Sequence, residues 1–343
     1  MTAQLRPMNL GEILDRTLQI YRSRFLVLFS IAAIPALALM AIKLADNRWF
    51  PQSQNRSADQ KGMDVLWNLF RSLLHYHFAA IVALLIFPIF AKIASAAILD
   101  QATSLRAALR FALSKWRSFL WIAFLKFAAQ LLIPEALTSG AILLVGGIEY
   151  ATGAFDDKGA VILVALALFS PILGGAALFL WLSSCLSLAV PVVALEPFTG
   201  FKAMKRSWKL SRDARIRIHV AWMSLSLLAI GLAIGFHMIL RGVAVYVFFH
   251  GQYSRLADQP LYRFMDYLLT AALSALTSPL YPIALTLFYY DQRVRREAFD
   301  IEWMMLRAGL VVPAPPQPET QPLPVSQPSP QPPPMPPQPG ALE

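Results

Sequence analysis

Charged residues and cysteine are both scarce in this sequence. Only 15% of its 343 residues are Asp, Glu, Lys or Arg, whereas about a quarter is usual for soluble globular proteins. The single cysteine, Cys185, excludes an intrachain disulfide and a zinc site built from several cysteines. Apolar residues make up 57% of the chain, and the mean hydropathy is +0.53. This surplus of apolar side chains predicts a protein that is embedded in lipid.

The sequence also lacks the common catalytic and ligand-binding motifs. It contains no HExxH, GxSxG, Walker A, GxGxxG or EF-hand pattern. His75 and His77 are the closest pair of histidines, but a spacing of two puts them on different faces of a helix, where they would chelate a metal poorly. His237 lies within an apolar segment, where a hydrogen bond to a neighbouring helix is the simpler expectation. We therefore expect no enzyme activity, no cofactor and no metal site.

Six apolar segments are long enough to cross a membrane, since a hydrocarbon core about 30 Å thick takes roughly 20 residues of helix. A soluble helical protein would not need so many runs of this length. The predicted fold is all-α: a polytopic membrane protein with six transmembrane helices arranged as three hairpins. Prolines interrupt five of the spans, and the third is long enough to be tilted or broken near Pro134. The predicted spans are about 25–44, 78–99, 119–147, 160–195, 218–249 and 264–290.

The distribution of basic residues predicts the orientation. The chain has 30 Lys and Arg against 20 Asp and Glu, a formal charge of +10. Nineteen of the basic residues precede odd-numbered spans or follow the last span, nine occupy the opposite loops, and two lie within spans. Because basic loops stay on the cytoplasmic side, we expect both termini to lie in the cytoplasm. A charge distributed by loop also argues against nucleic acid as a partner. The first span is expected to remain uncleaved, since a charged region of 24 residues precedes it.

A cytoplasmic amphipathic helix is predicted before each odd-numbered span. The first has a capping-box signature, Asn9 followed by Glu12. When the sequence is compared with itself shifted by 95 residues, the apolar stripe that begins at Leu10 matches one that begins at Leu105. A shift of 96 residues gives a weaker match between 103–110 and 199–206. This similarity favours three parallel repeats, although amphipathic helices of similar composition also align in this way.

The C-terminal segment differs from the rest of the chain. Residues 313–339 hold 14 of the 25 prolines and almost no charge, a composition that favours polyproline II and does not build a core. We therefore divide the chain into a six-span membrane domain at 1–306 and a disordered, proline-rich cytoplasmic tail at 307–343. The tail is interpreted as a spacer, and its PxxP spacings leave a protein ligand as the alternative.

The charged residues Lys92, Lys126 and Glu135 lie at depth within predicted spans. A charge at the membrane centre costs on the order of 3 kcal/mol even on a lenient insertion scale. Lys126 precedes Glu135 by nine residues, about 13 Å along a helix, so Lys92 is the better predicted partner. One interpretation is a proton or substrate site lined by Glu135 and Lys92. The other is a structural ion pair, or an interfacial position for the segment after Pro134.

Three stretches resemble the bacterial family known as the glycerophosphoryl diester phosphodiesterase membrane domain. The similarity extends over about residues 5–306. The family takes its name from members in which this membrane domain precedes a soluble phosphodiesterase, a barrel of roughly 250 residues. Only a short helix and the proline tract follow residue 290 here, so the resemblance implies a membrane architecture and not that activity. The stretches are 6–16 with 21–22, 194–196 with 203–210, and 289–300.

Together with the resemblance, which implies a bacterial inner-membrane protein, these features predict a non-enzymatic scaffold or accessory protein that contacts anionic lipid through its basic cytoplasmic face. A protein partner of unidentified kind would be reached by the tail. The alternative is a transporter or lipid-handling protein that uses Glu135 and Lys92, which predicts a polar cavity at mid-membrane. The candidate headgroup contacts are Lys202, Lys205, Arg206 and Lys209.

Overall fold

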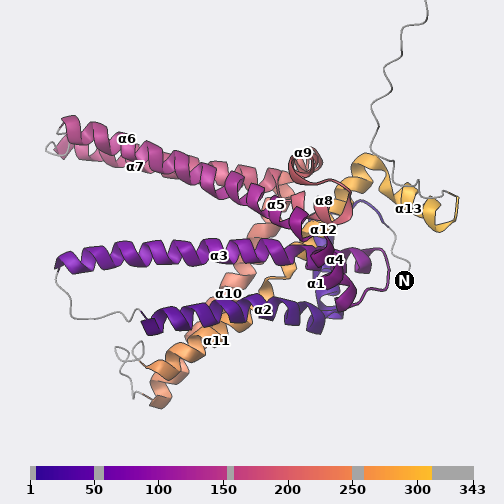
Figure 1. Cartoon of the computed structure of the whole chain (residues 1–343), viewed down its shortest axis with the longest axis horizontal. Coiled ribbons are helices and arrows are strands. Elements are labelled where there is room, and N and C mark those ends of the chain that lie inside the picture. Colours follow the sequence, from indigo (N-terminus) through magenta and orange to yellow (C-terminus); the bar gives the residue numbers. More distant parts are fainter. Residues whose placement is uncertain (1–4, 50–57, 153–157, 249–258, 311–343) are drawn as a thin grey trace, which may run out of the picture. The chain divides into compact units, whose positions relative to one another are not determined.

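The computed structural model describes residues 5–49, 58–152, 158–248 and 259–310. All the regular secondary structure within these residues is helical, and none of them forms a strand (Figure 1). Six helical segments are long and apolar enough to cross a membrane, which agrees with the predicted all-α fold and number of spans. The segments are Phe25–Ala45, Ile81–Ile98, Trp116–Ala141, Phe169–Leu195, Arg215–Tyr246 and Pro260–Glu297.

The described helices fall into two compact units, one extending to Asp300 and the other beginning at Ile301. We describe the first unit unless the second is named. The second comprises most of α13 and, from residue 311 onward, the predicted proline-rich tail, which lies outside the described residues. The helices are α1 (Leu10–Ser23), α2 (Phe25–Trp49), α3 (Ala58–Ile98), α4 (Leu105–Ser114), α5 (Trp116–Phe127), the π-helix η1 (Ala128–Leu132), α6 (Ile133–Thr152), α7 (Lys158–Cys185), α8 (Ala189–Leu195), α9 (Gly200–Ser211), α10 (Arg215–Phe248), α11 (Pro260–Thr277), α12 (Leu280–Glu297) and α13 (Phe299–Arg307).

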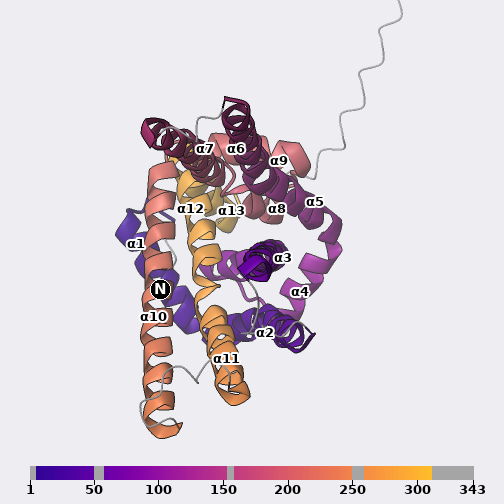
Figure 2. The same ribbon diagram turned by 90° about the vertical axis from the view of Figure 1, so that its left-hand side faces the viewer.

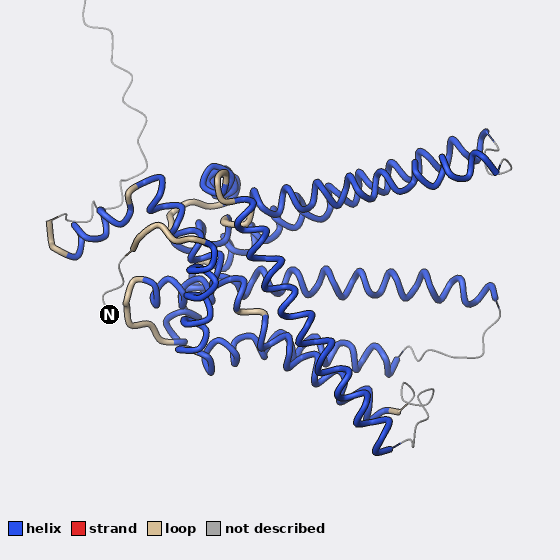
Figure 3. Tube along the Cα trace, turned by 180° about the vertical axis from the view of Figure 1, so that it is seen from behind, coloured by secondary structure: helices blue, strands red, loops and turns tan. Residues whose placement is uncertain are grey.

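The short helices lie together at one end of the first unit, which we call the base: α1, α4, α8, α9 and the second half of α12. Long helices extend from the base, with α6 alongside α7 and α2 alongside α11 (Figures 1 and 2). The view from behind shows the same arrangement (Figure 3). Helix α2 packs mainly on α11 and less on α3, which follows it in the chain. The helix contacts therefore do not divide the spans into three separate hairpins. The most completely buried side chains include Ile93, Leu188, Ile283, Phe288 and Tyr289.

Short helices precede α2, α5 and α10, and two of them begin with a side-chain cap. The capping box predicted at α1 is confirmed: Glu12 N donates to Asn9 Oδ1 and Asn9 N donates to Glu12 Oε2, both at 2.8 Å. Ser104 caps α4 in a similar way, through the backbone N–H of Ala107. The three helices α1, α4 and α9 begin at Leu10, Leu105 and Gly200, which are 95 residues apart. Their ends do not follow this spacing, since α1 is four residues longer than α4.

Proline has different effects at its five positions in the spans. Pro35, Pro88 and Pro171 lie inside helices that continue past them. The break expected near Pro134 is instead a π-helical turn, η1, which ends just before α6. Proline lacks an N–H, and a wider hydrogen-bonding pattern accommodates that loss. Only Pro279 accompanies an interruption, where α11 ends at Thr277 and α12 begins at Leu280.

A second interruption lies between α7 and α8, where no proline occurs. The carbonyl of Cys185, the last residue of α7, accepts hydrogen bonds from the hydroxyls of Ser207 (2.9 Å) and Ser211 (3.2 Å) of α9. These hydroxyls satisfy a carbonyl that would have no partner at a helix end. Cys185 itself is fully buried, as expected for a small packing residue.

The second span is part of a much longer helix than predicted. Helix α3 has 41 residues, about 60 Å of helix, and begins 20 residues before the predicted span start. The apolar stretch 65–74, which precedes the predicted span, is continuous with it in this one helix. Part of the segment 45–63 between the first two predicted spans is also helical, and residues 50–57 lie outside the described residues.

Two pairs of glycines in the spans have different surroundings. Gly175 of α7 lies so close to α6 that a Cβ there would stand 2.0 Å from Thr138 Oγ1. By contrast, Cβ atoms at Gly231 and Gly235 of α10 would meet nothing within 4 Å in the described structure. Helices α10 and α11 are instead joined by His237, whose Nε2 lies 3.2 Å from Thr270 Oγ1. The expected hydrogen bond of this histidine to a neighbouring helix is thus confirmed.

Candidate functional site

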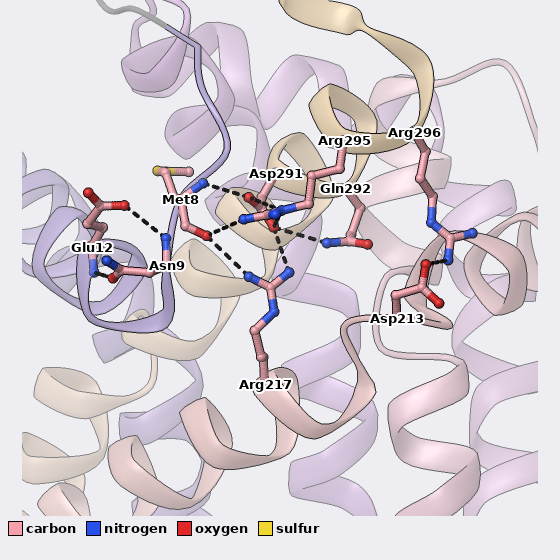
Figure 4. Close-up of polar contacts among 9 residues, drawn as sticks. All are labelled: Met8, Asn9, Glu12, Asp213, Arg217, Asp291, Gln292, Arg295 and Arg296. Carbon is pink, nitrogen blue, oxygen red and sulfur yellow. Dashed lines mark hydrogen bonds and ion pairs between the residues drawn. The ribbon is translucent and has the colours of Figure 1, made fainter.

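A buried carboxylate on α12 organises the base. Asp291 is fully buried, and its carboxylate accepts hydrogen bonds from Met8 N (2.8 Å) and Gln292 Nε2 (3.0 Å) (Figure 4). It also pairs with Arg217 Nη2 at 2.9 Å and Arg295 Nε at 2.9 Å. Both arginines donate in addition to the carbonyl oxygen of Met8. The chain just before α1 is thereby held against α10 and α12.

A second carboxylate, Glu196, follows α8 and is 9% exposed. Arg206 of α9 binds it in bidentate fashion through Nε (3.0 Å) and Nη2 (3.2 Å). The hydroxyl of Tyr289 donates to the same carboxylate at 2.9 Å. Arg206 also donates to Glu297 at 2.8 Å, and Arg293 does so at 3.0 Å. The bonds to Glu297 and Glu196 raise the pKa of Arg206, despite its partial burial.

A third contact joins α9 and α12 at the edge of the base. The guanidinium of Arg296 pairs with Asp213 and donates to the carbonyl of Lys209 at 2.6 Å (Figure 4). The three stretches that carry the family resemblance thus meet at the base, because each supplies residues to these contacts. We call the set around Asp291, Glu196 and Arg296 the basal network.

The chemistry of the basal network is that of mutually compensated charges. Its two most buried carboxylates, Asp291 and Glu196, each face at least one guanidinium, and this pairing leaves the carboxylate oxygens occupied. A general base needs an oxygen within reach of a substrate proton. Among the described residues, no group of three His, Cys, Asp or Glu side chains is placed to hold a metal ion. The network therefore fits a structural clasp.

A different kind of site lies among the spans, where a cavity of about 600 Å³ is lined from every one of them. Its charged side chain is Lys126 of α5, which is only 6% exposed. A second cavity, of about 390 Å³, shares four lining residues with the first and includes Lys43 and His75. The shared residues are Ala36, Leu39, Ala79 and Ser274.

The predicted pairing of Lys92 with Glu135 is not formed. The ammonium of Lys92 lies 5.3 Å from the ring centre of Phe111 in α4, as does that of Lys115. Burial, together with the nearby charge of Lys92, lowers the pKa of Lys115. Glu135 is exposed on α6, 20 residues beyond Lys115, or about 30 Å along the helix. Of the three predicted intramembrane charges, Lys126 lines the larger of the two cavities described above, and neither Lys92 nor Glu135 lines either of these two.

The four predicted headgroup contacts of α9 divide into two groups. Lys202, Lys205 and Lys209 are exposed. Arg206 is engaged by the carboxylates of Glu196 and Glu297, and its side chain is 25% exposed. The structure therefore leaves three of the four side chains available to an external ligand.

Sequence analysis missed both Asp291 and Glu196 as centres of a network. Each is an acidic residue that directly follows an apolar run and has basic residues nearby in the sequence. This position at the end of a span could have indicated an ion pair. The cavity had no such signal, since its lining comes from all six spans. Comparisons with family models, with curated proteins and with solved structures find no match to this chain.

Proposed function

We propose that the protein is a non-enzymatic scaffold or accessory protein of the bacterial inner membrane that contacts anionic lipid through the base. The observation that carries this proposal is the exposed face of α9. Lys202, Lys205 and Lys209 are exposed there beside Phe201 and Trp208, which are 69% and 38% exposed. Basic and aromatic side chains together suit a helix at the level of lipid headgroups.

The burial pattern of α9 agrees with an interfacial position. Its opposite face, which includes Ala203, Ser207 and Leu210, is buried against the rest of the base. A helix held in this way keeps its basic face outward without having to fold on the lipid. Each Lys near an anionic surface contributes about 1 kcal/mol of attraction, so three lysines supply a substantial preference for acidic headgroups.

Helix α4 has a related surface. Leu105, Leu109 and Leu113 are exposed along one side, and Arg106 and Arg110 are exposed next to them. An exposed leucine row in water would be an aggregation liability, whereas the same row in the headgroup layer is covered by acyl chains. Helices α4 and α9 thus support the same membrane contact at two places on the base.

The proposal includes the predicted orientation and family. With the base in the cytoplasm, α9 faces the leaflet whose loops carry most of the basic residues. We also propose that the chain belongs to the glycerophosphoryl diester phosphodiesterase membrane domain family. The meeting of the three resembling stretches in the basal network supports this, because it gives all three one structural role.

Native mass spectrometry of the full-length protein tests the lipid contact. We expect the protein to retain phosphatidylglycerol in preference to phosphatidylcholine, and the K202Q/K205Q/K209Q variant to lose most of that preference. The matched control is R71Q/R241Q/R263Q, which removes three charges from the opposite predicted side and should keep it. Equal retention by the wild type and the lysine variant would refute the contact.

Cysteine labelling tests the orientation. In a C185S background, a cysteine at position 205 should react with an impermeant maleimide only after the inner membrane is opened. A cysteine at position 158, which precedes the fourth span on the opposite predicted side, should react in intact spheroplasts. The reverse pattern would place the base outside the cytoplasm and remove the proposal.

A further inference from the structure

We propose that the cavity of about 600 Å³ among the spans binds one anionic amphiphile, with Lys126 holding its head group. The ligand class is a carboxylate or phosphate head on a single hydrocarbon tail. This site is separate from the lipid surface proposed for the base, since Lys126 lies on α5 inside a candidate span. It gives the lipid-handling alternative a different location from the predicted pair, Lys92 and Glu135.

The first argument is the charge of Lys126. Its side chain is 94% buried, and within the described residues no hydrogen bond or ion pair engages its ammonium. The described lining of the cavity contains no Asp or Glu. A buried ammonium is unfavourable without an opposite charge or hydrogen-bond acceptors. An anionic head group placed in the cavity would supply both.

The second argument is the polar part of the cavity lining. Several hydroxyl and amide side chains belong to it, so a bound head group would have donors besides the ammonium. The Ser184 and Ser187 hydroxyls already donate to the carbonyls of Trp181 (2.7 Å) and Ser184 (2.8 Å), which leaves the other polar side chains of the lining as donors. Carboxylate and phosphate oxygens accept several such hydrogen bonds at once. The polar lining comprises Lys126, Gln130, Ser183, Ser184, Ser187, His219, Ser274, Ser278 and Tyr281.

The third argument is the apolar remainder of the wall. Helices α2 and α3 line it with small and aromatic side chains such as Ala32, Ala36, Phe87 and Phe90. Pockets of about 300–1,000 Å³ with apolar walls and a few polar groups are typical of small-molecule sites. A free inorganic anion would gain nothing from these walls. A neutral lipid, conversely, would leave Lys126 unpaired.

The second cavity borders the first. It shares Ala36, Leu39, Ala79 and Ser274 with the first, and its other lining includes the polar side chains of Lys43, His75 and Thr270. The shared residues are mostly small and apolar, so a hydrocarbon tail anchored at Lys126 would contact apolar surface there. The tail is therefore expected to lie against α2 and α3.

Binding of radiolabelled palmitate to the full-length protein in phosphatidylcholine nanodiscs tests the proposal. We expect one palmitate per protein and at least tenfold weaker binding of hexadecanol, which has the tail without the charge. The K126M variant should bind palmitate at least tenfold more weakly than the wild type. The control K92M removes another lysine of a predicted span. The ammonium of Lys92 lies over the Phe111 ring and does not line the cavity, so K92M should bind palmitate normally.

Competition by palmitoyl lysophosphatidate identifies the head group: stronger competition than by palmitate indicates a phosphate ligand, and weaker competition indicates a carboxylate ligand. A36F keeps Lys126 but fills the space shared by both cavities, so it should lose binding of either probe even if K126M is not obtained in folded form. Unchanged palmitate binding by K126M or A36F would overturn the proposal, as would an equal loss in K92M. The K202Q/K205Q/K209Q variant should bind palmitate normally, which separates this site from the lipid contact of the base.

Discussion

The carboxylate of Asp291 accepts a hydrogen bond from the backbone N–H of Met8, 2.8 Å away and 283 residues distant in sequence. Arg217 and Arg295 donate to both residues and so join them twice more. The contact links the start of the first repeat-like unit to the end of the last span. The basal network therefore closes the chain on itself at the base.

Replacing Asp291 with asparagine should destabilise the protein by about 3 kcal/mol, because removing one partner of a buried ion pair leaves uncompensated charge. The loss should fall at the low end of the usual range, since the Arg217 and Arg295 side chains are 28% and 39% exposed. Thermal unfolding in detergent measures the change, and amide exchange at Met8 should accelerate. D15N, at an exposed position of α1, is the control and should unfold like the wild type.

Removing the hydroxyl of Tyr289 should cost about 1–2 kcal/mol, because a hydrogen bond to a charged acceptor contributes more than a neutral one. The Y289F variant keeps the ring and its edge-to-face contact with Tyr290, so the difference reports the bond to Glu196. Denaturation by heat provides the measurement. Y246F, at an 84% exposed position of α10, should change nothing. An equal effect of both variants would contradict the assignment.

The capping box of α1 should make stability depend on pH. The Asn9 backbone N–H and the Arg6 guanidinium hold the pKa of Glu12 below its usual value near 4.5. A carboxylate with a lowered folded-state pKa stabilises the fold above its unfolded pKa, and this contribution disappears as the pH falls through the folded pKa. The melting temperature of the wild type should therefore exceed that of E12Q at pH 6, and the two should converge near pH 3. A constant difference would argue against the ionised cap.

Alanine at Gly175 should loosen the contact between α6 and α7. Its Cβ would stand 2.0 Å from Thr138 Oγ1, and overpacking of this kind costs about 1–3 kcal/mol. The neighbouring G174A is a matched control, since a Cβ there meets nothing within 4 Å in the described structure. Adding T138A to G175A should restore part of the lost stability, which thermal unfolding of the three variants and the wild type would show. Absence of any rescue would place the strain elsewhere.

The existence of six span-length helices and the capping box at Asn9 were predictable because their causes are local. Twenty apolar residues in a row have few alternatives to a membrane helix. A cap depends on residues only three positions apart. The ends of the helices were less predictable: the polar residues 58–64 gave no reason to extend α3, and they are helical all the same.

The pairing of charges depended on tertiary structure. Lys92 and Glu135 both lie inside predicted spans, which made an ion pair between them conceivable. In the structure α3 packs so that the Lys92 ammonium lies over the ring of Phe111 in α4 instead. Arg206 was predicted to be an exposed headgroup contact because it lies among basic residues in the sequence. In the structure its guanidinium donates hydrogen bonds to the carboxylates of Glu196 and Glu297. Register between helices is set by packing along their whole length, which no local pattern encodes.

The sequence by itself determined that this chain is helical, apolar over six segments and basic on one set of loops, since hydropathy, capping and loop charge act over a few residues. Only the tertiary structure decided that Asp291 lies against Met8 and that Lys126 faces a cavity. Contacts such as these join segments up to 283 residues apart, and their geometry follows from how all the helices pack together.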